Sequence, residues 1–179
     1  MRLRRVVSRL ESDDFELFGL PRRFRLERAD LDARRRSLQA EVHPDRFATA
    51  DASARRVAMQ WAARVNEAYA RLKSPLTRAA YLCELHGVPI DAEDNTAMPA
   101  DFLMQQMQWR ESLDEADGRG AVEAVLATLE ADRDAAYLRV QALLDESGDF
   151  AAAAQEVRAL MFVERFAADV DDRLAAEGT

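Results

Sequence analysis

The feature that most constrains the fold is a set of apolar residues at helical spacing within residues 53–73. Recurrence every three or four positions places side chains on one face of an α-helix. This predicted helix is about 20 residues and about 30 Å long. A second helical pattern covers residues 30–42, and we expect the two helices to pack antiparallel because a short bend joins them. The apolar face of the longer helix comprises Ala54, Val57, Ala58, Trp61, Ala62, Val65, Ala68, Tyr69 and Leu72.

The bend between the two helices contains the tripeptide His43-Pro44-Asp45. Proline cannot continue a helix, and the residue before a proline is disfavoured in helical angles. We therefore expect the first helix to end at Val42 or His43 and the tripeptide to be exposed. One imidazole, one rigid ring and one carboxylate can contact a partner protein, but they lack the parts of a catalytic site.

The rest of the chain predicts five further helices and no strand. Glycine, proline and capping residues delimit these helices, and glycines separate the last three. Long amphipathic helices with short breaks are typical of an antiparallel three-helix bundle. The sequence therefore predicts an all-α protein with residues 1–12 as an extension, 13–87 as a first domain, 88–99 as a linker and 100–179 as a bundle. The expected helical ranges are 13–21, 74–86, 100–117, 121–146 and 149–176.

The charge is unevenly distributed along the chain. The net charge of −8 combines +6 in residues 1–90 with −14 in residues 91–179. A basic half joined to an acidic half indicates either two surfaces with different partners or two ordinary solvated surfaces. Charge alone leaves both interpretations open.

Composition argues against several classes of protein. No apolar run approaches the roughly 20 residues that span a bilayer, and the basic start lacks the apolar core of a secretory signal. The single cysteine, Cys83, cannot form an internal disulfide, and together with His43 and His86 it gives no zinc-binding spacing. We expect no metal or cofactor, a packing role for Cys83, and a helix-end position for His86. A Cys83–His86 pair could face each other on a helix, but nothing in the sequence supplies an orienting group, so we do not expect an enzyme.

The predicted helix at residues 100–117 is apolar on two opposite sides. A three-helix bundle normally buries one stripe per helix, so the second side is left over. Exposed methionine-rich surfaces with a charged rim are common at partner-binding sites. The alternative is packing against the N-terminal half, and the pattern alone slightly favours that alternative. The first side comprises Phe102, Gln106, Trp109 and Leu113, and the second comprises Leu103, Met104 and Met107.

Several segments together resemble the HscB family, the J-domain co-chaperones of iron–sulfur cluster assembly. The tripeptide alone would be a weak signal, but its position between antiparallel helices is typical of a J-domain. Residues 18–21 and 81–87 favour HscB over a general DnaJ protein, and residues 102–115 extend the match beyond the J-domain. The resemblance covers about residues 13–176 and is weakest in the last two helices. The matching segments are residues 15–21, 43–47, 65–69 and 74–82.

The resemblance implies two partners. The J-domain would dock on a DnaK-class chaperone, HscA in bacteria, and stimulate its ATP hydrolysis. The bundle would bind the cluster scaffold IscU and present it to the chaperone, which promotes cluster transfer to acceptor proteins. The implied chaperone-binding residues are Arg34, Arg35, Arg36, His43, Pro44, Asp45 and Arg46. The implied scaffold-binding residues are Leu103, Met104, Met107, Gln108, Glu111, Glu115 and Phe162.

The sequence departs from the family pattern at two of these surfaces. Val42 replaces the aromatic residue usual before the tripeptide, and Gln108 occupies a position that is often acidic. The chain lacks the cysteine-rich metal module of eukaryotic relatives, so we expect a bacterial protein. We also expect it to be cytoplasmic and monomeric.

Two other functions remain possible interpretations of the sequence. One is a general DnaJ-type co-chaperone for DnaK with other clients. The other is a nucleic-acid binder that uses the arginines of residues 2–9 and 34–36. The pI of about 4.9 and the lack of a known binding motif argue against nucleic acid.

Overall fold

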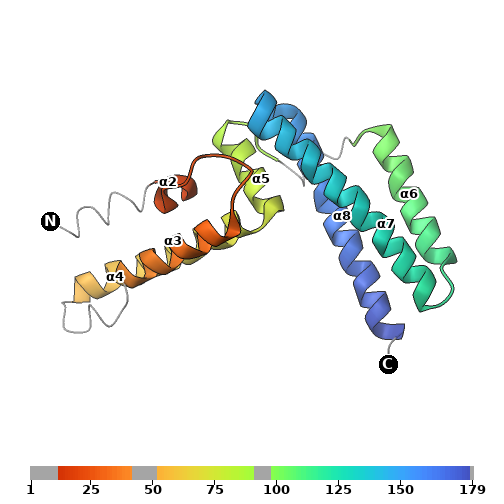
Figure 1. Ribbon diagram of the computed structural model, residues 1–179, viewed down its shortest axis with the longest axis horizontal. Coiled ribbons are helices and arrows are strands. Elements are labelled where there is room, and N and C mark those ends of the chain that lie inside the picture. Colours follow the sequence, from red (N-terminus) through yellow and green to blue (C-terminus); the bar gives the residue numbers. More distant parts are fainter. Residues whose placement is uncertain (1–11, 42–51, 91–97, 178–179) are drawn as a thin grey trace. The chain divides into compact units, whose positions relative to one another are not determined.

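The computed structural model describes residues 12–41, 52–90 and 98–177, and these ranges are helical with no strand (Figure 1). The chain divides into two compact units, Met1–Tyr81 and Leu82–Thr179. The all-α prediction is confirmed. None of the helices in the described ranges is long and apolar enough to cross a membrane.

The first unit is built on a helical hairpin of α3, Arg28–Glu41, and α4, Ala52–Lys73, which lie side by side (Figure 1). The pairing is antiparallel. Asp32 contacts Tyr69, whereas Gln39, which comes later in α3, contacts Asn66, which comes earlier in α4. The predicted stripes form the core of this hairpin, and Val42 lies outside the described residues. The fully or almost fully buried members are Leu31, Leu38, Trp61, Val65 and Leu72.

A short helix, α2 (Asp14–Phe18), packs on α4 and is shorter than the predicted range of 13–21, because it ends at Gly19. Asp13 caps its start, because the side-chain carboxylate accepts a hydrogen bond from the Glu16 N–H at 3.0 Å. Gly19 closes it with φ of +63°, a left-handed conformation that favours glycine. A Cβ at Gly19 would also lie 3.0 Å from Nη1 of Arg34. A side chain is therefore disfavoured there both by the backbone conformation and by this close contact.

A buried ion cluster attaches α2 to α4. Asp14 is fully buried, with its carboxylate 2.6 Å from Nη2 of Arg64 and 3.0 Å from Nη1 of Arg71. The Tyr81 hydroxyl accepts the Asp14 N–H at 3.0 Å, and the guanidinium of Arg71 lies over the Tyr81 ring. A buried carboxylate needs such partners, because an unpaired charge is costly to remove from water. Tyr81 belongs to α5, Pro75–Leu85, so the cluster joins three helices.

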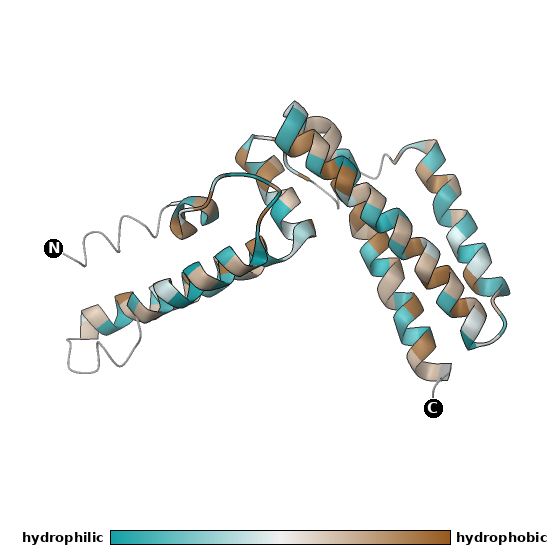
Figure 2. Ribbon diagram, viewed as in Figure 1, coloured by the Kyte–Doolittle hydropathy of each residue, from teal (hydrophilic) through white to brown (hydrophobic). Residues whose placement is uncertain are grey.

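The second unit contains α6, Ala100–Glu115, α7, Arg119–Gln141, and α8, Phe150–Glu177. Helices α7 and α8 pack along their length, and Figure 2 shows hydrophobic and hydrophilic residues alternating along both. This arrangement confirms the predicted three-helix bundle. The core cluster comprises Trp109, Val122, Leu129, Val163, Phe166, Ala167, Val170 and Leu174.

The end of α7 differs from the expected α-helix. Residues Ala142–Ser147 form a π-helical segment, η2, which ends at Gly148 with φ of +67°. The backbone N–H groups of Gly148 and Asp149 both donate to the carbonyl of Leu143. The last turn is therefore wider than an α-helical turn. The hydrophobic spacing in the sequence predicts a helix here but does not distinguish an α-helical from a π-helical turn.

Candidate partner-binding surfaces

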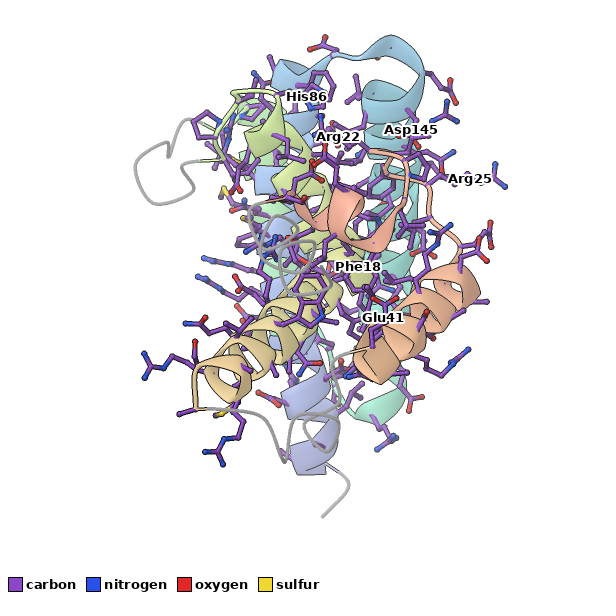
Figure 3. All side chains as sticks on the ribbon, turned by 90° about the vertical axis from the view of Figure 1, so that its left-hand side faces the viewer. Phe18, Arg22, Arg25, Glu41, His86 and Asp145 are labelled. Atoms are coloured by element: carbon purple, nitrogen blue, oxygen red, sulfur yellow. The ribbon has the colours of Figure 1, made fainter. Side chains whose placement is uncertain are left out.

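The tripeptide His43-Pro44-Asp45 and Arg46 lie outside the described residues. The described hairpin ends at Glu41, labelled in Figure 3, and begins again at Ala52. The predicted chaperone-contact loop therefore stays a prediction, and the geometry of this surface comes from the helices on either side.

The three consecutive arginines of α3 have three different environments. Arg34 donates from Nη1 to the carbonyl of Phe18 at 2.9 Å and so braces the end of α2 (Phe18 is labelled in Figure 3). Arg35 lies 4.0 Å from the centre of the Tyr69 ring and donates to Asn66 at 3.3 Å. Arg36 is exposed, and its guanidinium makes no hydrogen bond or ion pair with another residue of the described ranges. Of the three, Arg36 is the guanidinium most available to a partner.

A polar network closes the seam between α3 and α4. The Tyr69 hydroxyl donates to Oδ1 of Asp32 at 2.8 Å and accepts from Nη2 of Arg28 at 2.9 Å. The hydrogen bond from Tyr69, followed by the hydrogen bond and charge of Arg28, lowers the pKa of Asp32. The sequence identified Tyr69 as part of an apolar stripe and of a family motif but did not predict its bond to Asp32, because a contact between residues 37 positions apart has no local signature.

Helix α6 is two-sided, as the spacing predicts. Trp109 is 5% exposed, whereas Leu103, Met104 and Met107 are 46%, 58% and 70% exposed. The three exposed side chains therefore lie outside the core cluster of their own unit. Gln108, Glu111 and Glu115, also predicted for the scaffold surface, are exposed on the same helix. We call these six residues of α6 the scaffold patch.

Phe162 differs from the other residues predicted for this surface. It is half-buried on α8, with its ring 5.9 Å edge-on from Phe102 and 6.0 Å from Phe166, to which it is stacked. The guanidinium of Arg110 lies 5.6 Å from the ring centre. Phe162 therefore braces α6 against α8, and only part of its ring is available to a partner.

Cys83 and His86 do not form a reactive pair. Cys83 is fully buried, and burial raises its thiol pKa to about 11, with a smaller contribution from the Glu84 charge. His86, labelled in Figure 3, stacks on Phe150 at 3.7 Å, and its Nδ1 lies 2.8 Å from the carbonyl of Leu82. The predicted packing role of Cys83 is confirmed. No group of three potential ligands in the described part of the chain is arranged to hold a metal ion.

Comparisons with known proteins identify the class. The family model described as the HSCB C-terminal oligomerisation domain matches residues 98–171. The co-chaperone protein HscB homolog of Burkholderia mallei is 51% identical over 164 residues, covering 90% of this chain and 93% of the relative. The HscB homolog of Bordetella petrii is 54% identical over 159 residues, covering 88% and 94%.

Solved structures agree with these relatives. Chaperone HscB from Vibrio cholerae matches with a TM-score of 0.78 at 37% identity, covering 90% of this chain and 96% of that one. Human co-chaperone protein HscB matches with a TM-score of 0.86 at 28% identity, covering 91% and 82%. A helical hairpin followed by a helical bundle is thus the architecture of a J-domain co-chaperone. The chain belongs to the HscB family, which is a family of co-chaperones and not of enzymes.

Proposed function

We propose that this protein is a non-enzymatic adaptor that binds an IscU-type iron–sulfur scaffold, delivers it to the DnaK-class chaperone HscA and stimulates the chaperone's ATPase. Cluster transfer to acceptor proteins would follow in the bacterial cytoplasm, with the adaptor acting as a monomer. The observation that carries the proposal is the exposure of Leu103, Met104 and Met107 on a helix that buries Trp109 on its other side. Large apolar side chains grouped in this way are typical of a protein-binding surface.

The chaperone side of the proposal uses the first unit. His43, Pro44 and Asp45 would make the main contact, and Arg46 and Arg36 would meet acidic chaperone surface. The environments of Arg34 and Arg35 support positioning roles for both, because each is engaged within its own unit. Since exposed charges are screened by salt, docking should weaken as ionic strength rises.

The scaffold side uses the scaffold patch together with the exposed part of Phe162. Its apolar residues would anchor the interface, and Glu111 and Glu115 would form a charged rim. A few anchoring side chains usually supply most of the affinity of such an interface. In this proposal residues 13–87 act as the J-domain, 88–99 as the linker and 100–179 as the scaffold-binding domain, with 1–12 as an extension.

The chaperone contact is tested with His43→Gln. We expect this variant to lose stimulation of HscA ATP hydrolysis while it binds IscU as tightly as the wild type. Steady-state ATPase assays and calorimetric titration with IscU measure the two properties separately. Persistent stimulation would overturn the chaperone half of the proposal and leave the scaffold half standing.

The scaffold contact is tested by replacing Leu103, Met104 and Met107 by alanine. Each anchor should contribute about 1–2 kcal/mol or more to IscU binding. Leu138→Ala is the matched control, because Leu138 is 69% exposed on α7 and lies outside the scaffold patch. Equal IscU affinity for the triple variant and the control in a calorimetric titration would show that the patch has another role.

A general DnaJ-type co-chaperone is the second candidate. The methionines of the scaffold patch favour it, because flexible thioether side chains adapt to varied apolar clients. Binding assays with unfolded peptides separate the two candidates. Tight binding of IscU with weak binding of unfolded peptides supports the adaptor, and the reverse supports the general co-chaperone.

A further inference from the structure

The C-terminal unit has a second apolar surface, a groove of about 810 Å³ along α6, the α7–η2 segment and α8. Its apolar lining includes Phe102, Leu143, Leu160 and Val163. The volume lies within the range of about 300–1,000 Å³ that is typical of ligand-binding sites. No residue of the scaffold patch lines the groove, and neither does Phe162. The groove and the scaffold patch are therefore separate surfaces.

The two surfaces lie on different sides of α6. At 100° per residue, the groove-lining positions Asp101, Phe102, Gln105 and Trp109 fall on one flank, whereas the scaffold patch is centred about 130° away. The π-helical segment contributes Ala142 and Leu143 to the opposite wall. Departures from α-helical geometry of this kind are frequent at functional sites.

The charged residues of the groove have an acidic excess. Asp101, Asp132 and Glu156 line it, with Arg139 as the one basic residue in the lining. Arg139 lies 3.1 Å from Glu156 and offsets that carboxylate. Asp132 accepts a hydrogen bond from the indole of Trp109 at 3.3 Å, and Asp101 is exposed without an ion pair to any residue of the described ranges. A cationic group at the groove would therefore be attracted.

The length of the groove and its amide groups suit an extended chain. On α8 the lining runs from Ala152 to Val163, about 16 Å at the helical rise of 1.5 Å per residue. About five residues of extended chain span that distance. Gln105 and Gln155 line the groove, and neither side-chain amide forms a hydrogen bond within the part of the chain that the structure describes. Each amide can both donate to and accept from a peptide backbone.

We propose that this groove binds a short, extended, apolar segment of a partner protein that carries lysine or arginine. The apolar lining would take alternate side chains and the two glutamines would pair with the segment's backbone. The net acidic charge of the lining, with Asp101 as its exposed carboxylate, would attract the cationic groups of the segment. Because the groove is separate from the scaffold patch, the segment could bind while a scaffold protein occupies the patch.

The test uses the full chain and a capped five-residue peptide of alternating leucine and arginine. A peptide with glutamate in place of arginine is the charge-reversed probe. Calorimetric titration should give binding at least tenfold tighter for the arginine peptide. The NMR signal of the Trp109 indole N–H, assigned with Trp61→Phe, should shift on addition of this peptide.

Two variants and a matched control locate the site. Asp101→Asn/Glu156→Gln removes two groove carboxylates and should weaken arginine-peptide binding about tenfold. Asp171→Asn/Asp172→Asn removes the same charge from exposed positions on α8 outside the groove and should leave affinity unchanged. Ala159→Phe fills the groove and should abolish binding, with circular dichroism confirming that the helices are retained.

Three results would overturn the proposal. One is unchanged affinity in a folded Ala159→Phe variant, and another is equal weakening by the control pair. The third is a concentration-dependent dimer that Ala159→Phe disrupts, because a second copy of this chain would then be the occupant. Unchanged peptide affinity in the Leu103/Met104/Met107 triple alanine variant supports the separation of the two surfaces.

Discussion

The two units of this protein are stabilised in different ways. In the first unit the short helix α2 is held by charged and aromatic groups, with buried Asp14 between Arg64 and Arg71. Arg78, also buried, donates from Nε to the carbonyl of Phe24 at 2.8 Å. In the second unit the core cluster is formed by apolar and aromatic side chains around Leu129 and Val163.

This difference bears on how each unit presents a surface. Arginines that brace the first unit cannot also serve a partner freely, so most of the α3 arginine cluster is used internally. The second unit needs only one side of α6 for its core, which leaves the other side of that helix exposed. Family resemblance assigns whole clusters of residues to a binding surface. The environment of each side chain shows which members of a cluster stabilise the fold and which are exposed to a partner.

The largest effect is expected from a cavity in the second unit. Leu129→Ala should destabilise the bundle by about 4 kcal/mol, because a fully buried leucine loses its packing and leaves a void. Thermal unfolding followed by circular dichroism measures the loss. If the two units unfold independently, the hairpin transition should stay unchanged. A shift of both transitions together would show that the units are coupled.

A somewhat smaller effect is expected from breaking the ion cluster of the first unit. Asp14→Ala should cost about 3 kcal/mol, because it removes one partner of a buried ion pair. Denaturant unfolding measures the change in free energy. Asp30→Ala, at an exposed position in the first turn of α3, is the control and should change stability much less. Equal effects of the two variants would mean that α2 is not held by this cluster.

A smaller effect is expected at the seam between α3 and α4. Tyr69→Phe keeps the ring over which Arg35 lies but removes the hydroxyl that bonds Asp32 and Arg28. The melting temperature should fall modestly near pH 7. Since the folded pKa of Asp32 is lowered, its contribution is present above the unfolded pKa and is lost as pH falls through the folded value. The difference between variant and wild type should therefore shrink in acid, and a constant difference from pH 7 to pH 2 would contradict this account.

The smallest stability effect is expected at the scaffold patch. Replacing Leu103, Met104 and Met107 by alanine should change unfolding free energy by no more than about 0.5 kcal/mol per site, because all three are exposed. Chemical denaturation of the triple variant checks this. A loss several times larger would place these side chains in packing that stabilises the fold and would weaken the contrast between the two sides of α6.

The sequence by itself determined the helical class, the ends of most helices and the two-sided character of α6. Periodicity, capping residues and glycine act within a few positions, so they can be read locally; Gly19 and the stripe containing Trp61 are examples. The motifs around residues 15–21 and 74–87 also led to the HscB family.

Only the tertiary structure decided which charged side chains are engaged in contacts that stabilise the fold and where the second unit has a groove. Asp14 meets Arg71 across 57 sequence positions, and Arg34 reaches Phe18 across 16, so neither contact has a local pattern. The π-helical turn at Ala142–Ser147 and the groove beside it likewise depend on how three helices pack. Hydrophobic spacing predicts which face of a helix is buried, but the contacts and the gaps between faces are set by side chains that come together only when the chain folds.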